Sequence, residues 1–373
     1  MTNPWEKNLQ RWVHAGLIDA ATAGRVRAYE TEHSQVLRWP IRVALALGVI
    51  MVGAGVLLFV SAHWDELSPS ARFSLVLLMV GVFHVAGALT VERFEKLAQA
   101  LHVLGTITLG AGVYLAGQIF NLAEHWPGGV MLWALGAWLG WFVLRDWAQG
   151  FMCAILTPAW LASEWAEAMH GNGLGTSILA DGLVLLSFTY FTARTEEKSS
   201  LLRTGLSMMG GVMLLPCLGF FIFSRVQYSY SYSLHDLPTA LLIVGCTAAW
   251  VAPLALAYVF RGRAVWMNFA AALWLAVLGQ MKMDDKNLML YLWFAACSIA
   301  MIAWGVKEAR RERIDLGFLG FAATVLVFYF SNVFDKLGRS ASLISLGILF
   351  LAGGWALEKT RRRLVAGIKK AEA

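Results

Sequence analysis

Asp181 is the residue whose position most strongly suggests chemistry. It lies near the middle of a long apolar segment, residues 173–193, that contains no opposite charge. An ionisable side chain at membrane depth costs roughly 2.5–3.5 kcal/mol on insertion scales, so its presence needs a reason. One reading is a protonatable or cation-binding site. The other is a helix-packing aspartate that is protonated or bonded to a nearby hydroxyl, such as that of Ser187 or Thr189.

Two histidines, His84 and His102, form a second candidate group. They lie in consecutive apolar segments, 72–91 and 97–120. If these segments form a helical hairpin, the two imidazoles lie at a similar depth, nearer the cytoplasm, where they could face one another. Such a pair could relay protons or hold a metal ion, although two ligands are too few for a complete metal site. Histidines that pack between helices and bond to the backbone are the alternative.

A third group of polar residues gathers where the first and third apolar segments end, with Glu164, Glu167 and His170 on the same predicted side. Histidine with carboxylates suits zinc or another divalent cation, but no spacing here matches a known closed site. Solvated loop residues are the alternative, and we expect no cofactor. The candidate intramembrane polar site comprises Asp181, His84, His102, Gln118 and Asn121. The candidate outer-face cluster comprises His63, Asp65, Glu66, Glu124 and His125.

The segments that carry these residues have membrane composition. Of the 373 residues, 58% are apolar and 14% are charged, against about 45–50% and about 25% in soluble domains. Long apolar runs of about 20 residues alternate with short polar breaks, which predicts an all-α polytopic bundle of about twelve spans in antiparallel hairpins. The expected spans are 41–61, 72–91, 97–120, 127–144, 148–168, 173–193, 201–224, 237–260, 264–281, 288–306, 315–333 and 340–357.

Three regions follow from this pattern. Residues 1–40 predict a cytoplasmic amphipathic head, residues 41–357 the transmembrane bundle, and residues 358–373 a basic cytoplasmic tail. Within the head, Gly16 is expected to end a first short helix, and Asp19 to cap a second that runs from Ala20 to about residue 35.

The distribution of basic residues predicts the orientation. Alternate connections and both ends of the chain hold 24 of the 30 Lys and Arg residues. An excess of this kind marks cytoplasmic loops, so both termini are expected inside a bacterial inner membrane. The expected partners of the protein are membrane lipids, with other membrane protein subunits as an alternative. Nucleic acid is not expected, because topology already accounts for the positive charge.

The first hairpin is repeated in the second. Residues 47–58, Leu-Gly-Val-Ile-Met-Val-Gly-Ala-Gly-Val-Leu-Leu, align with residues 104–115, Leu-Gly-Thr-Ile-Thr-Leu-Gly-Ala-Gly-Val-Tyr-Leu. This relates a hairpin over 41–91 to one over 97–144. Both copies run in the same direction across the membrane, so the repeat is parallel.

Three motifs together resemble a family of bacterial membrane proteins, domain-of-unknown-function family 2157. They are Leu9-Gln10-Arg11-Trp12-Val13-His14-Ala15-Gly16-Leu17-Ile18, the first segment from Gly53-Ala54-Gly55 to His63-Trp64-Asp65, and Gly117-Gln118-Ile119-Phe120-Asn121. The resemblance covers residues 5–130. It implies a multispan topology, and it implies no reaction, substrate or functional residue.

Three functions are compatible with these features. The first is binding or transport of a small molecule, ion or lipid in an intramembrane cavity, supported by Asp181, the repeated hairpins and prolines such as Pro216 and Pro253 that break helices. The second is a non-catalytic scaffold or assembly subunit, because the loops are short and no soluble catalytic domain is evident. The third, an intramembrane metal-dependent enzyme, rests on the outer-face cluster alone, so we do not expect an enzyme.

Overall fold

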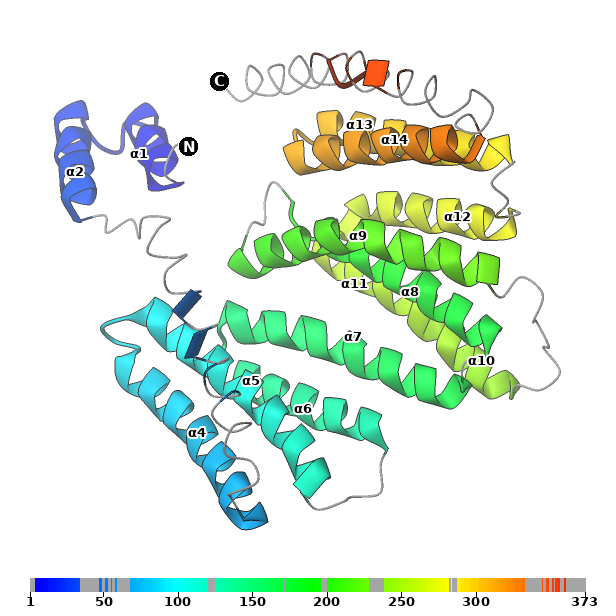
Figure 1. Ribbon diagram of the computed structural model, residues 1–373. Helices are drawn as coiled ribbons and strands as arrows, with labels where there is room; N and C mark the ends of the chain where they lie inside the picture. Colours follow the sequence, from blue (N-terminus) through cyan, green and yellow to red (C-terminus); the bar gives the residue numbers. More distant parts are fainter. Residues whose placement is uncertain are drawn as a thin grey trace. The chain divides into compact units, whose positions relative to one another are not determined.

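The computed structural model describes residues 4–33, 68–119, 125–170, 172–195, 200–227, 238–281, 283 and 287–332, with isolated positions within 47–58 and 344–359 (Figure 1). Every regular element in these residues is helical. The chain divides into two compact units, residues 1–108 and 109–373.

The first unit contains two short helices and the start of the membrane bundle. Its elements are α1 (Pro4–His14), α2 (Ala20–His33), α4 (Pro69–Thr90) and the first part of α5 (Glu95–Ile119). The predicted boundaries in the head are confirmed: Gly16 has a positive φ of 66° after α1, and Asp19 Oδ1 accepts a hydrogen bond from the Thr22 amide at the start of α2. A capping side chain of this kind satisfies an otherwise free helical N–H group.

The second unit holds the rest of the bundle. Its elements are α6 (Trp126–Leu144), α7 (Trp147–Met169), α8 (Gly173–Phe191), α9 (Leu201–Gln227), α10 (Thr239–Cys246), the π-helix η2 (Thr247–Val251), α11 (Ala252–Arg261), the 3₁₀ turn η3 (Gly262–Val265), α12 (Trp266–Gln280), α13 (Leu288–Lys307) and α14 (Arg311–Asn332).

Eight helical segments in the described residues are long and apolar enough to cross a membrane. They are Pro69–Thr90, Glu95–Gln118, Trp126–Leu144, Gly173–Phe191, Leu201–Gln227, Thr239–Gln280, Leu288–Lys307 and Arg311–Asn332. This confirms the all-α membrane class. The expected spans 41–61 and 340–357 lie outside the described residues, apart from isolated positions.

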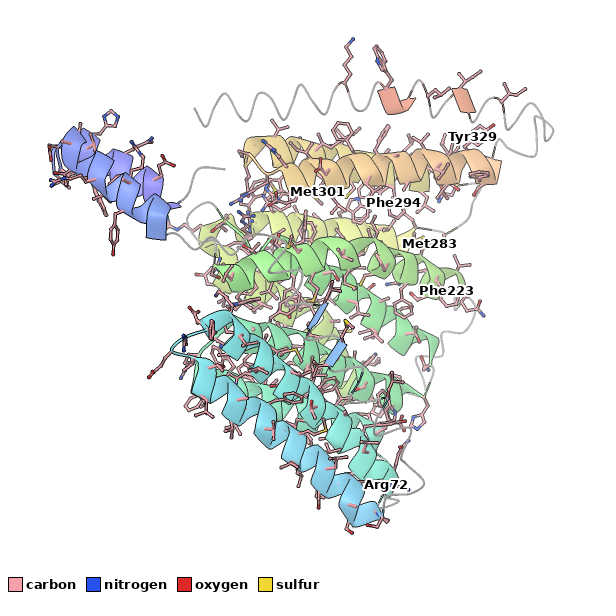
Figure 2. The ribbon with its side chains drawn as sticks, turned by 60° about the vertical axis from the view of Figure 1, so that its left-hand side comes forward. Arg72, Phe223, Met283, Phe294, Met301 and Tyr329 are labelled. Carbon is pink, nitrogen blue, oxygen red and sulfur yellow. The ribbon has the colours of Figure 1, made fainter. Side chains whose placement is uncertain are left out.

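Helix α8 is the central element of the second unit. Of its most apolar stretch, 67% is buried, whereas the same share in the other candidate spans does not exceed 39%. Its side chains join those of α9, α12 and α13 in one apolar core that includes Leu185, Phe221 and Leu275. Met283, Phe294 and Met301 pack against this core from its edge (Figure 2). Of the candidate spans in the described residues, α8 is therefore the most enclosed by its neighbours.

Gly210 allows the backbones of α8 and α9 to come into contact. An ideal Cβ at Gly210 would lie 2.2 Å from the Phe191 amide nitrogen and 2.4 Å from the Ser187 carbonyl oxygen. Beside it, Ser207 Oγ donates a 2.8 Å hydrogen bond to the Phe191 carbonyl. Small residues and interhelical hydroxyl bonds are the usual means of helix association in a membrane.

This contact predicts that Gly210→Ala is destabilising, although alanine favours a helix over glycine. The added methyl group meets backbone atoms that cannot move aside, and overpacking of this kind costs about 1–3 kcal/mol. Gly219→Ala on the same helix is the matched control, because nothing lies within 4 Å of its ideal Cβ. Thermal unfolding of the purified proteins in one detergent would measure both changes. Equal stability of the two variants would contradict the close approach.

Candidate functional site

Asp181 is paired with a cation from the neighbouring helix. Arg225 Nη2 lies 2.8 Å from Asp181 Oδ1 and 3.1 Å from Oδ2. The aspartate side chain is 8% exposed and the arginine side chain 20%. Each group therefore neutralises the other in a region where an isolated charge would be strongly unfavourable.

The hydroxyl groups suggested by the sequence have other partners. Ser187 Oγ lies 3.3 Å from Cys217 Sγ, and Thr189 Oγ1 donates to the Pro253 carbonyl at 3.1 Å. The partner of Asp181 is thus a guanidinium 44 positions along the chain and not a hydroxyl of its own helix. Arg225 is one of the six Lys and Arg residues outside the basic connections and chain ends that predict the orientation.

Arg225 reaches Asp181 because its side chain lies back along its own helix. It belongs to the last turn of α9, and its Cζ lies 5.1 Å from the ring centroid of Phe221, one turn earlier. Long basic side chains cover apolar surface with their stems while the charged group reaches a polar partner. Helices α8 and α9 are antiparallel: Ser207, near the start of α9, bonds Phe191 at the end of α8. This course brings Arg225, at the end of α9, alongside Asp181 in α8.

The π-helix η2 and helix α12 complete the surroundings of the pair. A Cβ at Gly182, the residue after Asp181, would lie 3.0 Å from Ala249 Cα of η2. The neighbouring Trp250 indole also interacts with the Asp181 carboxylate. On the other side, a Cβ at Gly279 of α12 would lie 3.4 Å from Arg225 Nη2. Four elements therefore meet at the pair, and π-helical turns often occur at functional sites.

The ion pair does not use all the donors of Arg225. Both contacts to Asp181 come from one nitrogen, Nη2. The buried Nε has no hydrogen-bond partner within the described part of the chain, and neither has Nε1 of Trp274, which packs against the same core. A guanidinium can hold a carboxylate or phosphate through two parallel bonds. Arg225 can therefore donate a further hydrogen bond, through Nε, to an acceptor group that enters the site.

His84 of α4 and His102 of α5 lie against one another. Their Nδ1 atoms lie 3.1 Å apart, and the ring centroids are separated by 5.4 Å. His102 is buried at 6% exposure. The pair belongs to the first unit, so it forms a group of its own.

The outer-face cluster is described only in part. His125 Nε2 lies 2.8 Å from Glu164 Oε2, and the Trp126 indole donates to Glu167 at 3.1 Å. Gln118 is exposed and donates to the Tyr114 hydroxyl. Among the residues that the structure describes, no three His, Cys, Asp or Glu side chains are grouped as metal ligands. The remaining predicted residues lie outside the described residues: His63, Asp65, Glu66, Asn121 and Glu124.

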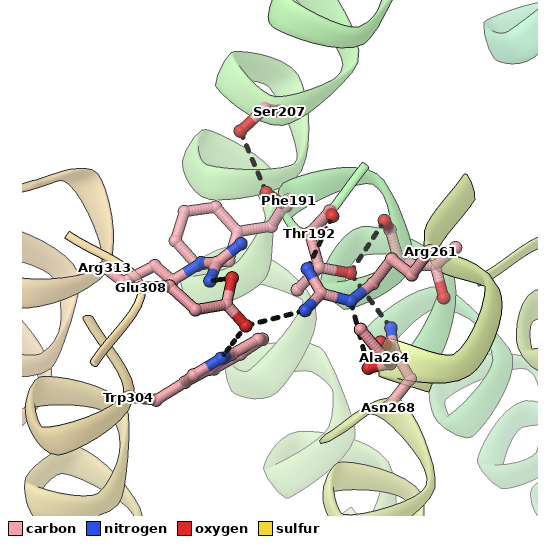
Figure 3. A network of polar contacts seen from close by, with 10 residues as sticks. Phe191, Thr192, Ser207, Arg261, Ala264, Asn268, Trp304, Glu308 and Arg313 are labelled. Atoms are coloured by element: carbon pink, nitrogen blue, oxygen red, sulfur yellow. Dashed lines mark hydrogen bonds and ion pairs between the residues drawn. The ribbon is translucent and has the colours of Figure 1, made fainter. Parts of the chain in front are cut away.

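Figure 3 shows a charged network whose two arginines belong to the basic connections that predict the orientation. Glu308 follows α13 and accepts hydrogen bonds from Arg261, Arg313 and the Trp304 indole. The side chains of Arg261 and Arg313 are 1% and 2% exposed. Their guanidinium carbons lie 5.2 and 4.1 Å from the ring centroid of Trp304. Arg261 also donates to the Thr192 carbonyl at the end of α8, so one carboxylate ties several helix ends together.

The network predicts an acid-sensitive contribution to stability. Burial alone would raise the pKa of Glu308, but hydrogen bonds from Arg313 and Trp304 and the charges of both arginines outweigh burial and lower the pKa. A lowered pKa adds stability above the ordinary value of 4.5, and this stability is lost as the pH falls through the lowered value. Unfolding temperatures at pH 7 and at about pH 4 should therefore differ more in the wild type than in Glu308→Gln. Glu312→Gln, which lies outside the network, should behave like the wild type.

The Asp181–Arg225 pair predicts a second, opposite pattern. Arg225→Gln leaves a buried carboxylate without its cation, and removing one partner of a buried pair typically costs about 3–5 kcal/mol. Protonation of Asp181 would relieve this cost, so the loss of thermal stability should be larger at alkaline than at acidic pH. The double variant Asp181→Asn/Arg225→Gln should be more stable than Arg225→Gln alone. Additive losses in the double variant would show that the two groups do not interact.

Comparison with known proteins supports the membrane class. No curated protein and no solved structure gives a significant match to the chain. The part of the chain that matches a family model holds α2, α4, α5 and α6, with His84 and His102 but without Asp181. This confirms the resemblance found from the sequence motifs. Residues 10–149 match the family described as Predicted membrane protein (DUF2157).

Proposed function

We propose that this membrane protein binds and transports a small anion at the Asp181–Arg225 pair, with a proton as the coupled ion. The observation that carries the proposal is the buried pair itself, at the meeting point of α8, α9, η2 and α12. Ionisable groups within membrane helices commonly mark pathways for substrates and protons.

The chemistry follows from an exchange of partners on Arg225. An entering carboxylate or phosphate takes the guanidinium, first through the free Nε and then through Nη2. Asp181 is then left as an unpaired buried carboxylate, which is unfavourable, so it takes up a proton. Release of the anion restores the ion pair and frees the proton. Anion and proton are thus bound together and released together.

An anion fits the site better than a metal cation. A cation would have to bind Asp181 in competition with Arg225, and it would leave the guanidinium buried without a counter-charge. The unpaired Nε–H of Arg225 can instead donate to an acceptor on an anion. Buried donors without acceptors are rare in folded proteins, and each needs an explanation.

The same proposal includes an orientation and a span count. Arg203 Nη1 donates to the Phe260 carbonyl, and Arg261 bonds both Thr192 and Glu308. Three basic connections thus meet at one end of the second unit, as expected for cytoplasmic loops of a bacterial inner membrane. Twelve spans remain the proposed count: Thr239–Gln280 is 42 residues long and contains the turn η3, and α7 and the predicted spans 41–61 and 340–357 complete the set.

The proposal predicts that anions stabilise the purified protein. Thermal unfolding would be followed in detergent with inorganic phosphate, succinate and glutamate, and with sodium and potassium chloride as cation controls. A ligand at a hundred times its Kd adds about 2.7 kcal/mol of stability. At least one anion should raise the unfolding temperature of the wild type but not of Arg225→Gln. Arg263→Gln, an exposed arginine outside the site, is the matched control.

Two results would overturn the proposal. Stabilisation of Arg225→Gln equal to that of the wild type would place the anion elsewhere. No stabilisation by any of the anions, together with protein subunits that copurify in fixed ratio, would favour the scaffold alternative. An anion that passes this test would then be followed as labelled solute into proteoliposomes under a pH gradient.

A further inference from the structure

The two membrane helices of the first unit carry the same four-residue pattern where they meet. His84-Val85-Ala86-Gly87 lies on α4, and His102-Val103-Leu104-Gly105 lies on α5. In each copy the glycine follows the histidine by three positions, so both lie on one face of the helix. Neither His84 nor His102 lies in the repeated segments, residues 47–58 and 104–115.

Each histidine occupies the space left by the glycine of the other helix. An ideal Cβ at Gly87 would lie 2.8 Å from His102 Cε1, and one at Gly105 would lie 2.7 Å from His84 Nε2. Real Cβ atoms essentially never approach this closely. The contact is therefore reciprocal: two glycines make room for two imidazoles, and the rings are held with their Nδ1 atoms 3.1 Å apart.

This geometry limits how many protons the pair can hold. A neutral imidazole carries one ring proton and a cationic imidazole carries two. At 3.1 Å the two Nδ1 atoms have room for one proton between them. In the neutral pair one ring donates and the other accepts. One added proton gives an imidazolium bonded to an imidazole, a charge-assisted hydrogen bond. A second would set two N–H groups against each other and break the contact.

Other charged groups on the two helices lie away from the pair. They are Arg72 at the start of α4, Glu95 and Lys96 at the start of α5, and Glu92 and Arg93 in the turn. Glu95, Lys96 and Gln99 bond one another at exposed positions. Among the described residues of α4 and α5, the ionisable group that faces His84 is His102.

The pair also lies within two helices that are long and apolar enough to cross a membrane. His84 lies six positions before Thr90 at the end of α4, which corresponds to about 9 Å at the α-helical rise per residue.

From these observations we propose that His84 and His102 form an intramembrane proton-binding site that takes up one proton per pair. The two imidazoles share this proton through their Nδ1 atoms, and the four-residue pattern on each helix builds the site. The proposal does not rest on the Asp181–Arg225 pair, which belongs to the other unit.

Counting protons tests the proposal directly. Purified full-length protein would be titrated between about pH 8 and pH 5, where histidine changes charge, and the protons bound per molecule compared between variants. His84→Gln/His102→Gln should bind one proton fewer than the wild type. The matched control, His14→Gln/His170→Gln, replaces two exposed histidines that lie far apart in the sequence, so the two double variants remove the same number of imidazoles.

A loss of two protons or of none in His84→Gln/His102→Gln would contradict the proposed site. A loss of two protons would mean that the histidines titrate independently, and no loss would mean that they only pack. If the double variant does not fold, Gly105→Ala provides the test, because it keeps both imidazoles and places a methyl group against His84. Separation of the rings should then raise the uptake from one proton to two, and an unchanged count would contradict the shared proton. None of these counts depends on anion binding at Arg225.

Discussion

A charge buried among apolar helices must find a partner, and this constraint organises the second unit. Asp181 meets Arg225 across α8 and α9. At the end of the bundle, Glu308 holds Arg261 and Arg313. The two arrangements solve the same problem differently. Glu308 has several donors on both oxygens and joins helix ends, which is a structural role, whereas the Asp181–Arg225 pair leaves a buried guanidinium nitrogen unused, which is why we assign a ligand to it.

Close backbone contact is what brings these groups together. Gly210 lets α9 touch α8, Gly182 lets η2 approach beside Asp181, and Gly87 and Gly105 seat the histidine rings. The bilayer provides little hydrophobic force between helices, so packing and polar contacts must hold them. Glycines beside polar residues in this chain therefore mark the points where elements far apart in the sequence meet.

Much of the fold and part of the site could be predicted from the sequence. Long apolar runs predicted the membrane helices. Gly16 and Asp19 predicted where the short helices end and begin, because these signals are local. The His84–His102 contact was predictable because a short turn fixes the depth of both residues. Arg225 was missed because it lies at a helix end, and only the backward course of its side chain brings it to Asp181.

Longer-range features needed the structure. Arg261, Glu308 and Arg313 lie in separate connections, and a count of basic residues treats them alike. Their pairing depends on how helix ends are placed, which no local pattern encodes. The π-helical turn beside Asp181 was not predicted from the sequence either. Pro253 indicated a break near it but could not show that Ala249 would pack on Gly182.

In the proposed exchange, an anion replaces Asp181 on Arg225 while Asp181 takes up a proton. Difference infrared spectra of the purified protein, with and without a stabilising anion, report this exchange through the C=O stretch of a protonated carboxylic acid. The account predicts that this band appears when the anion binds to the wild type and is absent from Asp181→Asn. An anion that binds while Asp181 remains ionised would contradict it.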